Sequence, residues 1–199
     1  RDSIEVSGGV NYRYFHGLRT MKACENILDS RELANVKLDK KALFIAALFH
    51  DIGKVVYVEA NGTLQGDRSK DKISHEELGA RILPKYLESI VSKSTIEQVA
   101  DIIRNQHNPK SRLIETKVLH DADVLDSIGL INVWRMFTYS GKKARSLEET
   151  LAYYEETSKD KKRKEHLYFS VTKEFAKRRR TKLKKFISDF EKEYKYQDF

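Results

Sequence analysis

Most of this chain repeats its apolar residues with the period of an α-helix. Over residues 12–28, the apolar side chains Phe15, Leu18, Met21 and Ile27 recur at helical spacing, which predicts a first helix. Only two prolines interrupt the whole length, and no segment is repetitive or of low complexity. Such a chain is expected to be helical almost throughout.

The second predicted helix begins near Asp39, a suitable N-cap, and ends at Gly53. Residues 55–66 then alternate apolar and polar side chains around Asn61 and Gly62, a pattern that fits either a small β-hairpin or a loop.

Capping signals predict the helices that follow. The capping box "SHEE" (74–77) opens a helix that Pro84 should kink or divide, and the capping box "STIE" (94–97) opens one that ends at His107. A long helix is expected over 116–140, stopped by Gly141. "SLEE" (146–149) opens another, and the last helix runs from about 170 to 194.

No stretch makes a convincing sheet, so the prediction is an all-α fold. Hydrophobic residues form 40% of the 199, enough for one well-formed core. We therefore expect a single domain across 1–199, with its core over about 12–140 and the C-terminal helices of 146–194 packed on it.

The net charge of +8 is concentrated in residues 158–166 and 173–185. Such basic runs either attract phosphate-bearing partners, nucleotides or nucleic acid, or form a solvated helix face. Few aromatic residues interleave with them, so the stacking platform of a single-strand binder is missing. We favour the solvated face, with attraction of phosphates as a secondary role, and do not favour nucleic acid as the partner.

No apolar run approaches membrane-spanning length, so no membrane partner is expected. The single cysteine, Cys24, excludes an intrachain disulfide and fits a reducing, cytoplasmic setting.

Candidate chemistry lies in the histidines. Any one of them is ordinary in a helix, but His16, His50, His75 and His107 come from four different predicted helices, and the carboxylate-rich stretch 120–126 comes from a fifth. Side chains that converge from several helices are how helical bundles build metal sites.

His50 and Asp51 are adjacent and cannot share one face of a helix. Both can still reach a single ion beyond the helix end, where metal–ligand bonds are about 2 Å long. Mixed nitrogen and oxygen ligands suit a divalent manganese, iron, cobalt, zinc or magnesium ion.

The order of His16, the doublet His50-Asp51 and a distal aspartate resembles the HD superfamily of metal-dependent phosphohydrolases. Four further segments also resemble that family, in the family's order: "RYFHGLRT", "SHEELGARIL", "IIRNQH" and "DADVLDSIGLINVWRMF". The last is similar to small stand-alone members, some of which hydrolyse nucleoside triphosphates to monophosphates and pyrophosphate. The resemblance spans about residues 12–194.

This resemblance implies an HD-domain helical bundle with a metal site at its centre. The implied ligands are His16, His50, Asp51 and Asp123, the aspartate of an Ala-Asp pair. Asp121, two residues away on the helix, should point elsewhere and either supports the ligands or accepts a proton from water.

Three further residues of this region have weaker signals. Asp126, one turn beyond Asp123, either orients a ligand or caps a break in the helix. His120 fits no motif and is expected to be a surface or packing residue. Lys54 either neutralises a substrate phosphate or faces solvent.

His75 and His107 bear on the number of metals, because members with two metals use histidines there as ligands. Members with one metal use them to hold phosphate or to donate a proton, and we favour one metal, with both residues catalytic. Arg13, Arg19 and Arg135 are candidates for substrate binding. The alternative for Arg13 and Arg19 is to face solvent, and the alternative for Arg135 is to be a buried ion-pair partner.

The predicted function is metal-dependent hydrolysis of a small phosphoester or phosphoanhydride, a nucleotide in the first place, with manganese as the first metal to test. The alternatives are an HD-type nuclease or a cyclic-nucleotide phosphodiesterase. More remote are a di-iron oxygenase and a non-enzymatic module that binds a partner through its basic helix.

Overall fold

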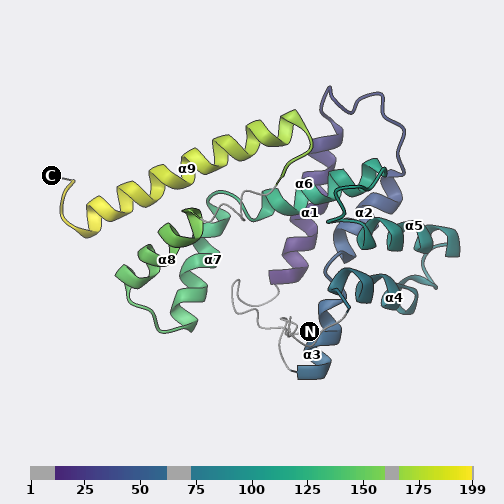
Figure 1. Ribbon diagram of the computed structural model, residues 1–199, viewed down its shortest axis with the longest axis horizontal. Coiled ribbons are helices and arrows are strands. Elements are labelled where there is room, and N and C mark those ends of the chain that lie inside the picture. Colours follow the sequence, from purple (N-terminus) through teal and green to yellow (C-terminus); the bar gives the residue numbers. More distant parts are fainter. Residues whose placement is uncertain (1–11, 62–72, 160–165, 199) are drawn as a thin grey trace.

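The computed structural model describes residues 12–61, 73–159 and 166–198 (Figure 1). Within these residues the chain forms nine α-helices and no strand, which confirms the all-α prediction. In chain order they are α1 (Tyr12–Leu28), α2 (Lys40–Phe49), α3 (Lys54–Asn61), α4 (His75–Leu87), α5 (Lys93–Arg104), α6 (Ile114–Asp126), α7 (Ile131–Lys142), α8 (Leu147–Lys159) and α9 (Ser170–Tyr194).

Local capping explains where several helices begin. Asp39 caps α2 and Ser74 caps α4, and each side chain accepts a hydrogen bond from the backbone N–H three residues later. Ser146 and Glu149 cap α8 reciprocally, because each side chain accepts from the other residue's N–H. These starts were predicted, as were both ends of α1 and α9.

Two predictions for the first half of the chain are wrong, and of the two effects expected of Pro84, one is not seen. Helix α2 ends at Phe49, because residues 50–53 form tight turns instead of a last helical turn. Residues 55–61 belong to α3 rather than to a hairpin or loop, and 62–66 lie outside the described residues. Pro84 does not divide α4, which runs through it.

Four later boundaries are also wrong. Helix α5 is capped by Ser92, two residues before the predicted cap, and it ends at Arg104, short of His107. The predicted helix over 116–140 is two helices, because Gly129 adopts a φ of 96° between α6 and α7, a value that a helix cannot contain. Gly141 does not stop α7, which continues to Lys142.

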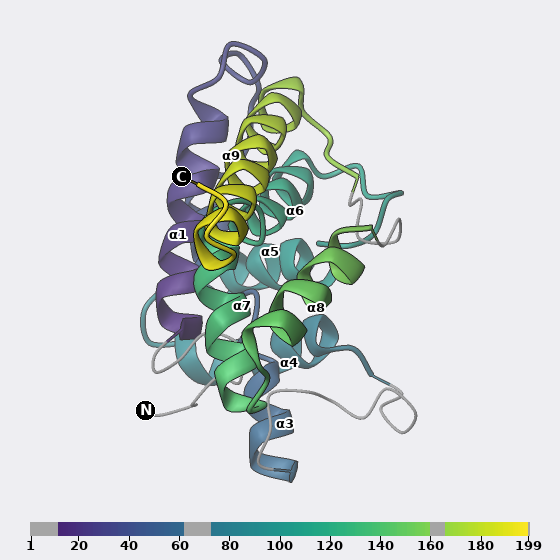
Figure 2. The ribbon, with the colours of Figure 1, turned by 90° about the vertical axis from the view of Figure 1, so that its left-hand side faces the viewer.

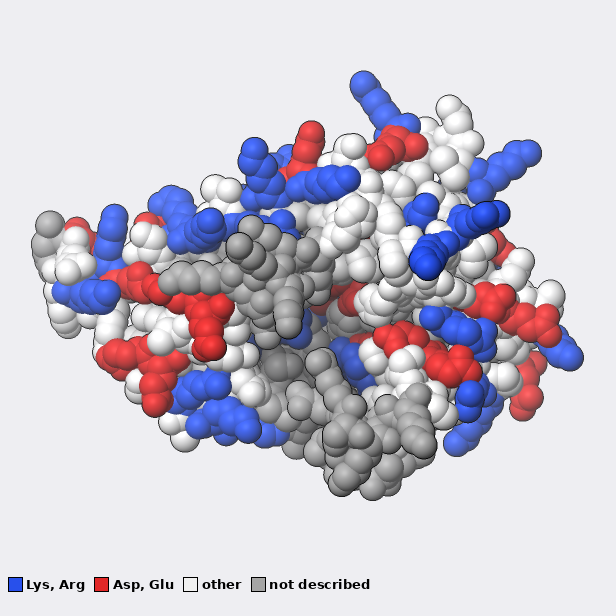
Figure 3. All heavy atoms as spheres, viewed as in Figure 1, with Lys and Arg blue, Asp and Glu red and all other residues white. Residues whose placement is uncertain are grey.

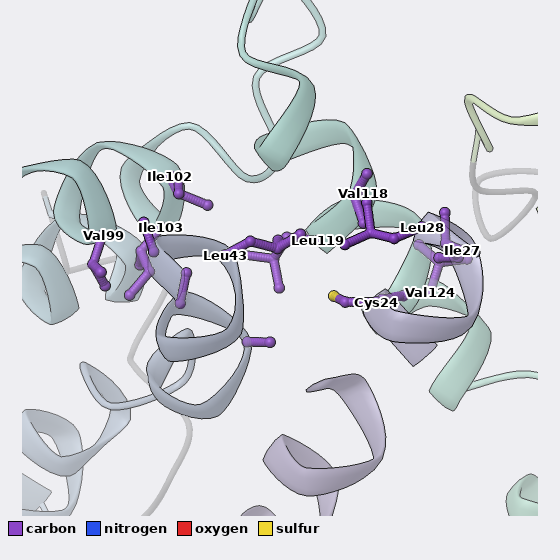
Figure 4. Close-up of a cluster of buried hydrophobic side chains, with 14 of the residues drawn as sticks. Cys24, Ile27, Leu28, Leu43, Val99, Ile102, Ile103, Val118, Leu119 and Val124 are labelled. Atoms are coloured by element: carbon purple, nitrogen blue, oxygen red, sulfur yellow. The ribbon is translucent and has the colours of Figure 1, made fainter. Parts of the chain in front are cut away.

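The main core is buried between α1, α2, α4, α5 and α6. Its centre includes Cys24, Leu43, Leu83, Ile103 and Leu119, none of which is more than 1% exposed, and Figure 4 shows part of it. Burying a large apolar side chain contributes roughly 1.5–3 kcal/mol, so this cluster is the main source of stability for the helices that carry the histidines.

A second, smaller core lies between α7, α8 and the C-terminal half of α9. It is built from Met136, Leu151, Leu183 and Ile187. Ala176, near the start of α9, belongs to the main core instead, so α9 takes part in both. Figures 1 and 2 show α9 reaching from the α1–α6 bundle across α7 and α8, with α3 projecting from the opposite edge.

No helix in the described part of the chain combines the length and the hydrophobicity that crossing a bilayer requires.

Candidate metal centre

Two buried imidazoles and a carboxylate converge where α1, α2 and α6 meet. His16 Nε2 lies 3.0 Å from His50 Nε2 and 3.2 Å from Asp123 Oδ1, and His50 Nε2 lies 3.6 Å from the same oxygen. These three residues are the one group of potential metal ligands found among the described residues, with donor atoms within 4.8 Å of one another.

The opposite nitrogen of each imidazole is held by the protein. Asp126 Oδ2 lies 2.7 Å from His16 Nδ1, and the carbonyl oxygen of Ala47 lies 2.9 Å from His50 Nδ1. When the two rings are neutral, as metal binding requires, these acceptors place the ring proton on Nδ1, so that both Nε2 atoms present a lone pair toward Asp123. Asp126 therefore orients His16, a predicted ligand, which is one of the two roles expected for Asp126.

The electrostatics of the cluster are those of paired opposite charges. Burial disfavours a charged His50, but the carboxylates of Asp51 and Asp123 outweigh it and raise the pKa of His50 to about 9. Burial also opposes ionisation of Asp123, but its bonds to His16 and His50 hold the pKa of Asp123 well below its usual range. Without an ion, an imidazolium compensates the carboxylates.

Asp51 lies at the edge of this cluster. Its carboxylate oxygens are 3.8 Å from both His16 Nε2 and His50 Nε2, and it forms ion pairs with Lys54 (2.6 Å) and with Arg13. Burial raises the pKa of Asp51, but the charge of His50, the contact with His75 and then the charges of Lys54 and Arg13 outweigh burial. The pKa of Asp51 is therefore well below its usual range. Asp51 thus connects the imidazoles to the side chains of Arg13 and Lys54, which together form a cationic rim beside the cluster.

Gly53 brings the start of α4 to the same place. A Cβ atom at Gly53 would lie 1.9 Å from the carbonyl oxygen of His75 and 2.5 Å from the backbone nitrogen of Gly79, so only glycine permits this approach. As a result, His75 Nε2 lies 3.5 Å from Asp51 Oδ1.

His107 is near this rim but not in the cluster. Glu76 Oε1 lies 3.3 Å from His75 Nε2 and 3.6 Å from His107 Nε2, and His107 Nδ1 lies 3.3 Å from His120 Nδ1. Burial lowers the pKa of His107. His120 is a packing residue, as expected, since its Nε2 also hydrogen-bonds the carbonyl oxygen of His166.

Two residues near the site were not singled out from the sequence. Glu76 is the carboxylate between His75 and His107, and its position inside a capping box concealed it. Gln106 is buried and donates from Nε2 to Asp123 Oδ2 at 2.9 Å, while its Oε1 has no partner among the described residues. Only its place next to His107 in "IIRNQH" pointed to it.

Asp121 lies outside the cluster, which corrects its predicted role as a proton acceptor. Its side chain is fully buried and accepts hydrogen bonds from the backbone N–H groups of Tyr168 and Phe169 and from the Thr172 hydroxyl. Asp121 therefore anchors the start of α9.

Arg19 also differs from the expectation of substrate binding. Its guanidinium forms a bidentate pair with Asp126, with Nε 2.6 Å from Oδ1 and Nη2 2.9 Å from Oδ2. Arg19 thus holds the carboxylate that orients His16.

Arg135 is half-buried, and its guanidinium lies 5.2 Å from the ring centre of Tyr12. Tyr12 in turn stacks on His16 with ring centres 5.9 Å apart. No carboxylate in the described part of the chain lies within ion-pairing distance of Arg135.

The residues present fit a divalent ion. Two imidazole nitrogens bound to one ion at about 2.1 Å lie about 3 Å apart when they meet it at a right angle, and the Nε2 atoms of His16 and His50 are 3.0 Å apart. The ligand set of two imidazoles and one or two carboxylates suits a first-row transition metal.

Comparison with known proteins agrees with this geometry. A family model, the HD domain, matches residues 13–128, and the chain belongs to that family. No curated protein matches the sequence.

Solved structures share the fold along almost their whole length. The crystal structure of Bacillus subtilis YpgQ in complex with ADP is 22% identical, with 90% of this chain and 87% of that chain covered and a TM-score of 0.61. An HD-superfamily hydrolase from Bacillus thuringiensis is 24% identical, with 94% and 88% covered and a TM-score of 0.63. The Lin1889 protein of Listeria innocua is 25% identical, with 93% and 92% covered and a TM-score of 0.59.

Proposed function

We propose that this protein is a metal-dependent phosphohydrolase that acts on a nucleotide. The observation that carries the proposal is the convergence of His16, His50 and Asp123 beside the cationic groups paired with Asp51. Similarity to a protein crystallised with ADP supports a nucleotide as the first substrate to test.

His16, His50 and Asp123, with Asp51 beside them, would hold the ion. When bound, a divalent ion lowers the pKa of a water molecule and polarises a phosphoryl oxygen. Asp126 and the Ala47 carbonyl keep both imidazoles aimed at one point, so the ligands need little rearrangement.

The cationic rim would bind the phosphates. Arg13 and Lys54 are partly exposed, with side-chain exposures of 27% and 18%, and both can offset charge on a phosphoryl group next to Asp51. Arg135 has no carboxylate partner among the described residues and lies 5.2 Å from the ring centre of Tyr12, which stacks on His16, so it could bind a second or third phosphate.

Of His75 and His107, His75 is the better-placed proton donor for the leaving oxygen, because its Nε2 lies 3.5 Å from Asp51 Oδ1. Glu76 Oε1 lies 3.3 Å from the same nitrogen, His75 Nε2, and helps to hold it in place. His107, whose pKa is lowered by burial, is neutral at pH 7 and suits hydrogen bonding to substrate.

The test combines metal analysis of the purified protein with release of phosphate or pyrophosphate from a panel of nucleotides in the presence of Mn²⁺. We expect one ion per chain and turnover of at least one nucleotide, both abolished in His50→Ala and Asp51→Ala. His166→Ala is the matched control, since that exposed histidine lies outside the cluster. A variant at position 50 that keeps full metal content and rate would disprove the site.

One observation favours a second candidate, an HD-type nuclease. Lys and Arg side chains follow α9 across the upper left of the surface in Figure 3. A nuclease would bind oligonucleotides through this face with a steep dependence on salt and would cleave them with Mn²⁺. Cleavage of oligonucleotides but not of free nucleotides would favour this candidate over the first.

A further inference from the structure

A pocket of about 270 Å³ lies behind the metal centre, between α1, α6 and α9. Its wall is largely apolar, and it is lined there by Ala23, Ile27, Leu125, Val171 and Phe175. Since a water molecule occupies about 30 Å³ in the liquid, the pocket has room for a ligand of roughly ten non-hydrogen atoms.

The charged residues of the pocket are unbalanced in favour of cations. Arg19, Lys22 and Arg179 line it, against one carboxylate, Asp126. Both oxygens of Asp126 are already engaged by Arg19, and one also by His16. Asp126 therefore repels an incoming anion little, and the pocket has an excess of positive charge.

Arg179 is the cation best placed to bind a ligand. It is half-buried, lies 4.5 Å from the ring centre of Phe175, and donates from Nη1 to the carbonyl oxygen of Leu125. No carboxylate among the described residues pairs with it, and burial lowers its pKa. A guanidinium has five N–H donors, so most of those of Arg179 remain available.

A neighbouring pocket of about 480 Å³ extends this positive surface. It shares Phe175 and Arg179 with the first pocket and adds Arg178 and Lys182, and no acidic residue lines it. Anions are thus attracted to the entrance of the first pocket by residues of the basic stretch 173–185.

The position of Asp126 connects the pocket with the metal centre. Its carboxylate lines the pocket and also lies 2.7 Å from His16 Nδ1, while His16 Nε2 faces Asp123 and His50 on the other side. A ligand that draws Arg19 away from Asp126 changes how that carboxylate holds the imidazole.

We propose that the pocket between α1, α6 and α9 is a second binding site, for a small organic phosphate or phosphonate with an apolar body, and that its occupancy alters metal affinity through Asp126 and His16. The anionic head binds Arg179 and competes with Asp126 for Arg19, and the body packs against Ile27 and Val171. Binding itself is independent of the proposed function, whereas the coupling rests on the proposed metal centre.

The test of binding uses benzylphosphonate, which has both features and cannot be hydrolysed, titrated into protein kept metal-free with EDTA. We expect saturable binding that benzyl alcohol and inorganic phosphate each show at least about tenfold more weakly. Arg179→Gln should weaken it at least about tenfold, because a charge-assisted hydrogen bond is lost. Arg180→Gln, an exposed neighbour on α9 that lines neither pocket, is the matched control.

A second variant keeps the test decisive if Arg179→Gln unfolds. Ala23→Leu fills the pocket from α1 without removing a charge and should also abolish binding, whereas Ala152→Leu on the exposed face of α8 should not. His50→Ala should leave binding in EDTA intact. Binding that survives both Arg179→Gln and Ala23→Leu would overturn the site.

The coupling is measured as the affinity for Mn²⁺ with and without saturating benzylphosphonate. By reciprocity, each ligand must change the affinity of the other by the same factor, which we expect to be at least threefold in the wild type and absent in Arg179→Gln. An unchanged Mn²⁺ affinity would overturn the coupling. Because no measurement here uses turnover, a failure of the proposed activity would be seen separately.

Discussion

Three aspartates of one helix, α6, have three different surroundings. Asp123 contacts His16 and His50, Asp126 supports His16 from the next turn, and Asp121 faces the start of α9. Helical spacing predicts this division in part, because residues three apart share a face and residues two apart do not. The partners of Asp121 lie at least 47 residues away in the sequence and could not be predicted from local pattern.

The hydrogen bonds of Asp121 to the start of α9 indicate that this residue stabilises the fold. In Asp121→Asn, an amide N–H₂ group would face the N–H and O–H donors of the α9 start, so we expect the free energy of unfolding to fall by about 2–3 kcal/mol. Chemical denaturation measures this loss, and Asp189→Asn, an exposed partner of Lys185, should change little.

The same variant separates the two roles that the sequence allows for Asp121. At a temperature where Asp121→Asn is folded, metal content and turnover should match those of the wild type. A folded variant that binds metal but has lost turnover would return Asp121 to the catalytic site.

At the scale of elements, the turn after α2 shows that the hydrophobic pattern does not determine where a helix ends. The sequence predicts that α2 continues to Gly53, yet it ends at Phe49, and the turn places His50 and Asp51 against different neighbours. The alternation over 55–61 resembles a strand, but short apolar runs do not distinguish strands from buried helices, and this one is α3.

Capping residues, in contrast, predicted the starts of α4 and α8, although the predicted cap at Ser94 was wrong because Ser92 caps α5. Ser74 and Ser146 bond to N–H groups three residues away, so four letters of sequence contain the whole interaction. The break at Gly129 depends on the packing of α9, whose Arg179 would contact a Cβ there at 2.9 Å. Local sequence does not reveal such a neighbour.

Gly53 sets the contact between two elements, and its replacement should separate them. In Gly53→Ala the new Cβ would collide with the backbone of α4 at His75. We expect a loss of roughly 1–3 kcal/mol in stability, and a fall in turnover of up to about a hundredfold because His75 moves away from Asp51.

Gly141→Ala is the matched control, because a Cβ at Gly141 meets nothing within 4 Å and the residue lies inside α7. That substitution should be neutral or stabilise the helix by up to about 1 kcal/mol. Thermal unfolding and single-turnover assays of both variants test the contrast. Equal behaviour of the two would show that the approach of α4 to Gly53 is not needed.

For the whole molecule, the charge of the metal centre links stability to pH. His50 has a pKa of about 9 in the folded protein without metal, above the value of about 6.5 expected when unfolded. A raised pKa means that its stabilisation is complete below about pH 6.5 and is lost as the pH rises toward 9. We expect the metal-free protein to lose stability across this range, on the order of 3 kcal/mol.

The affinity for metal should have the opposite dependence, because an ion binds only the neutral imidazoles and must displace their protons. Denaturation in EDTA at pH 6 and pH 9, together with Mn²⁺ titrations at both values, measures the two trends. His50→Gln, which is neutral throughout, should lose most of the dependence of stability. A metal-free wild type that is more stable at pH 9 than at pH 6 would contradict the charge assignment.

The hydrogen bonds between Asp121 and the start of α9 also affect the order in which the chain can fold during its synthesis. All residues of the metal centre are made before residue 127, but the donors that satisfy Asp121 come 47 to 51 residues after it. At ordinary rates of translation this is a delay of roughly 2 to 10 seconds. Until those donors leave the ribosome, burying the Asp121 carboxylate is costly, so α6 cannot settle fully against the bundle. The formation of α9 thus determines when the histidines are brought to their final positions.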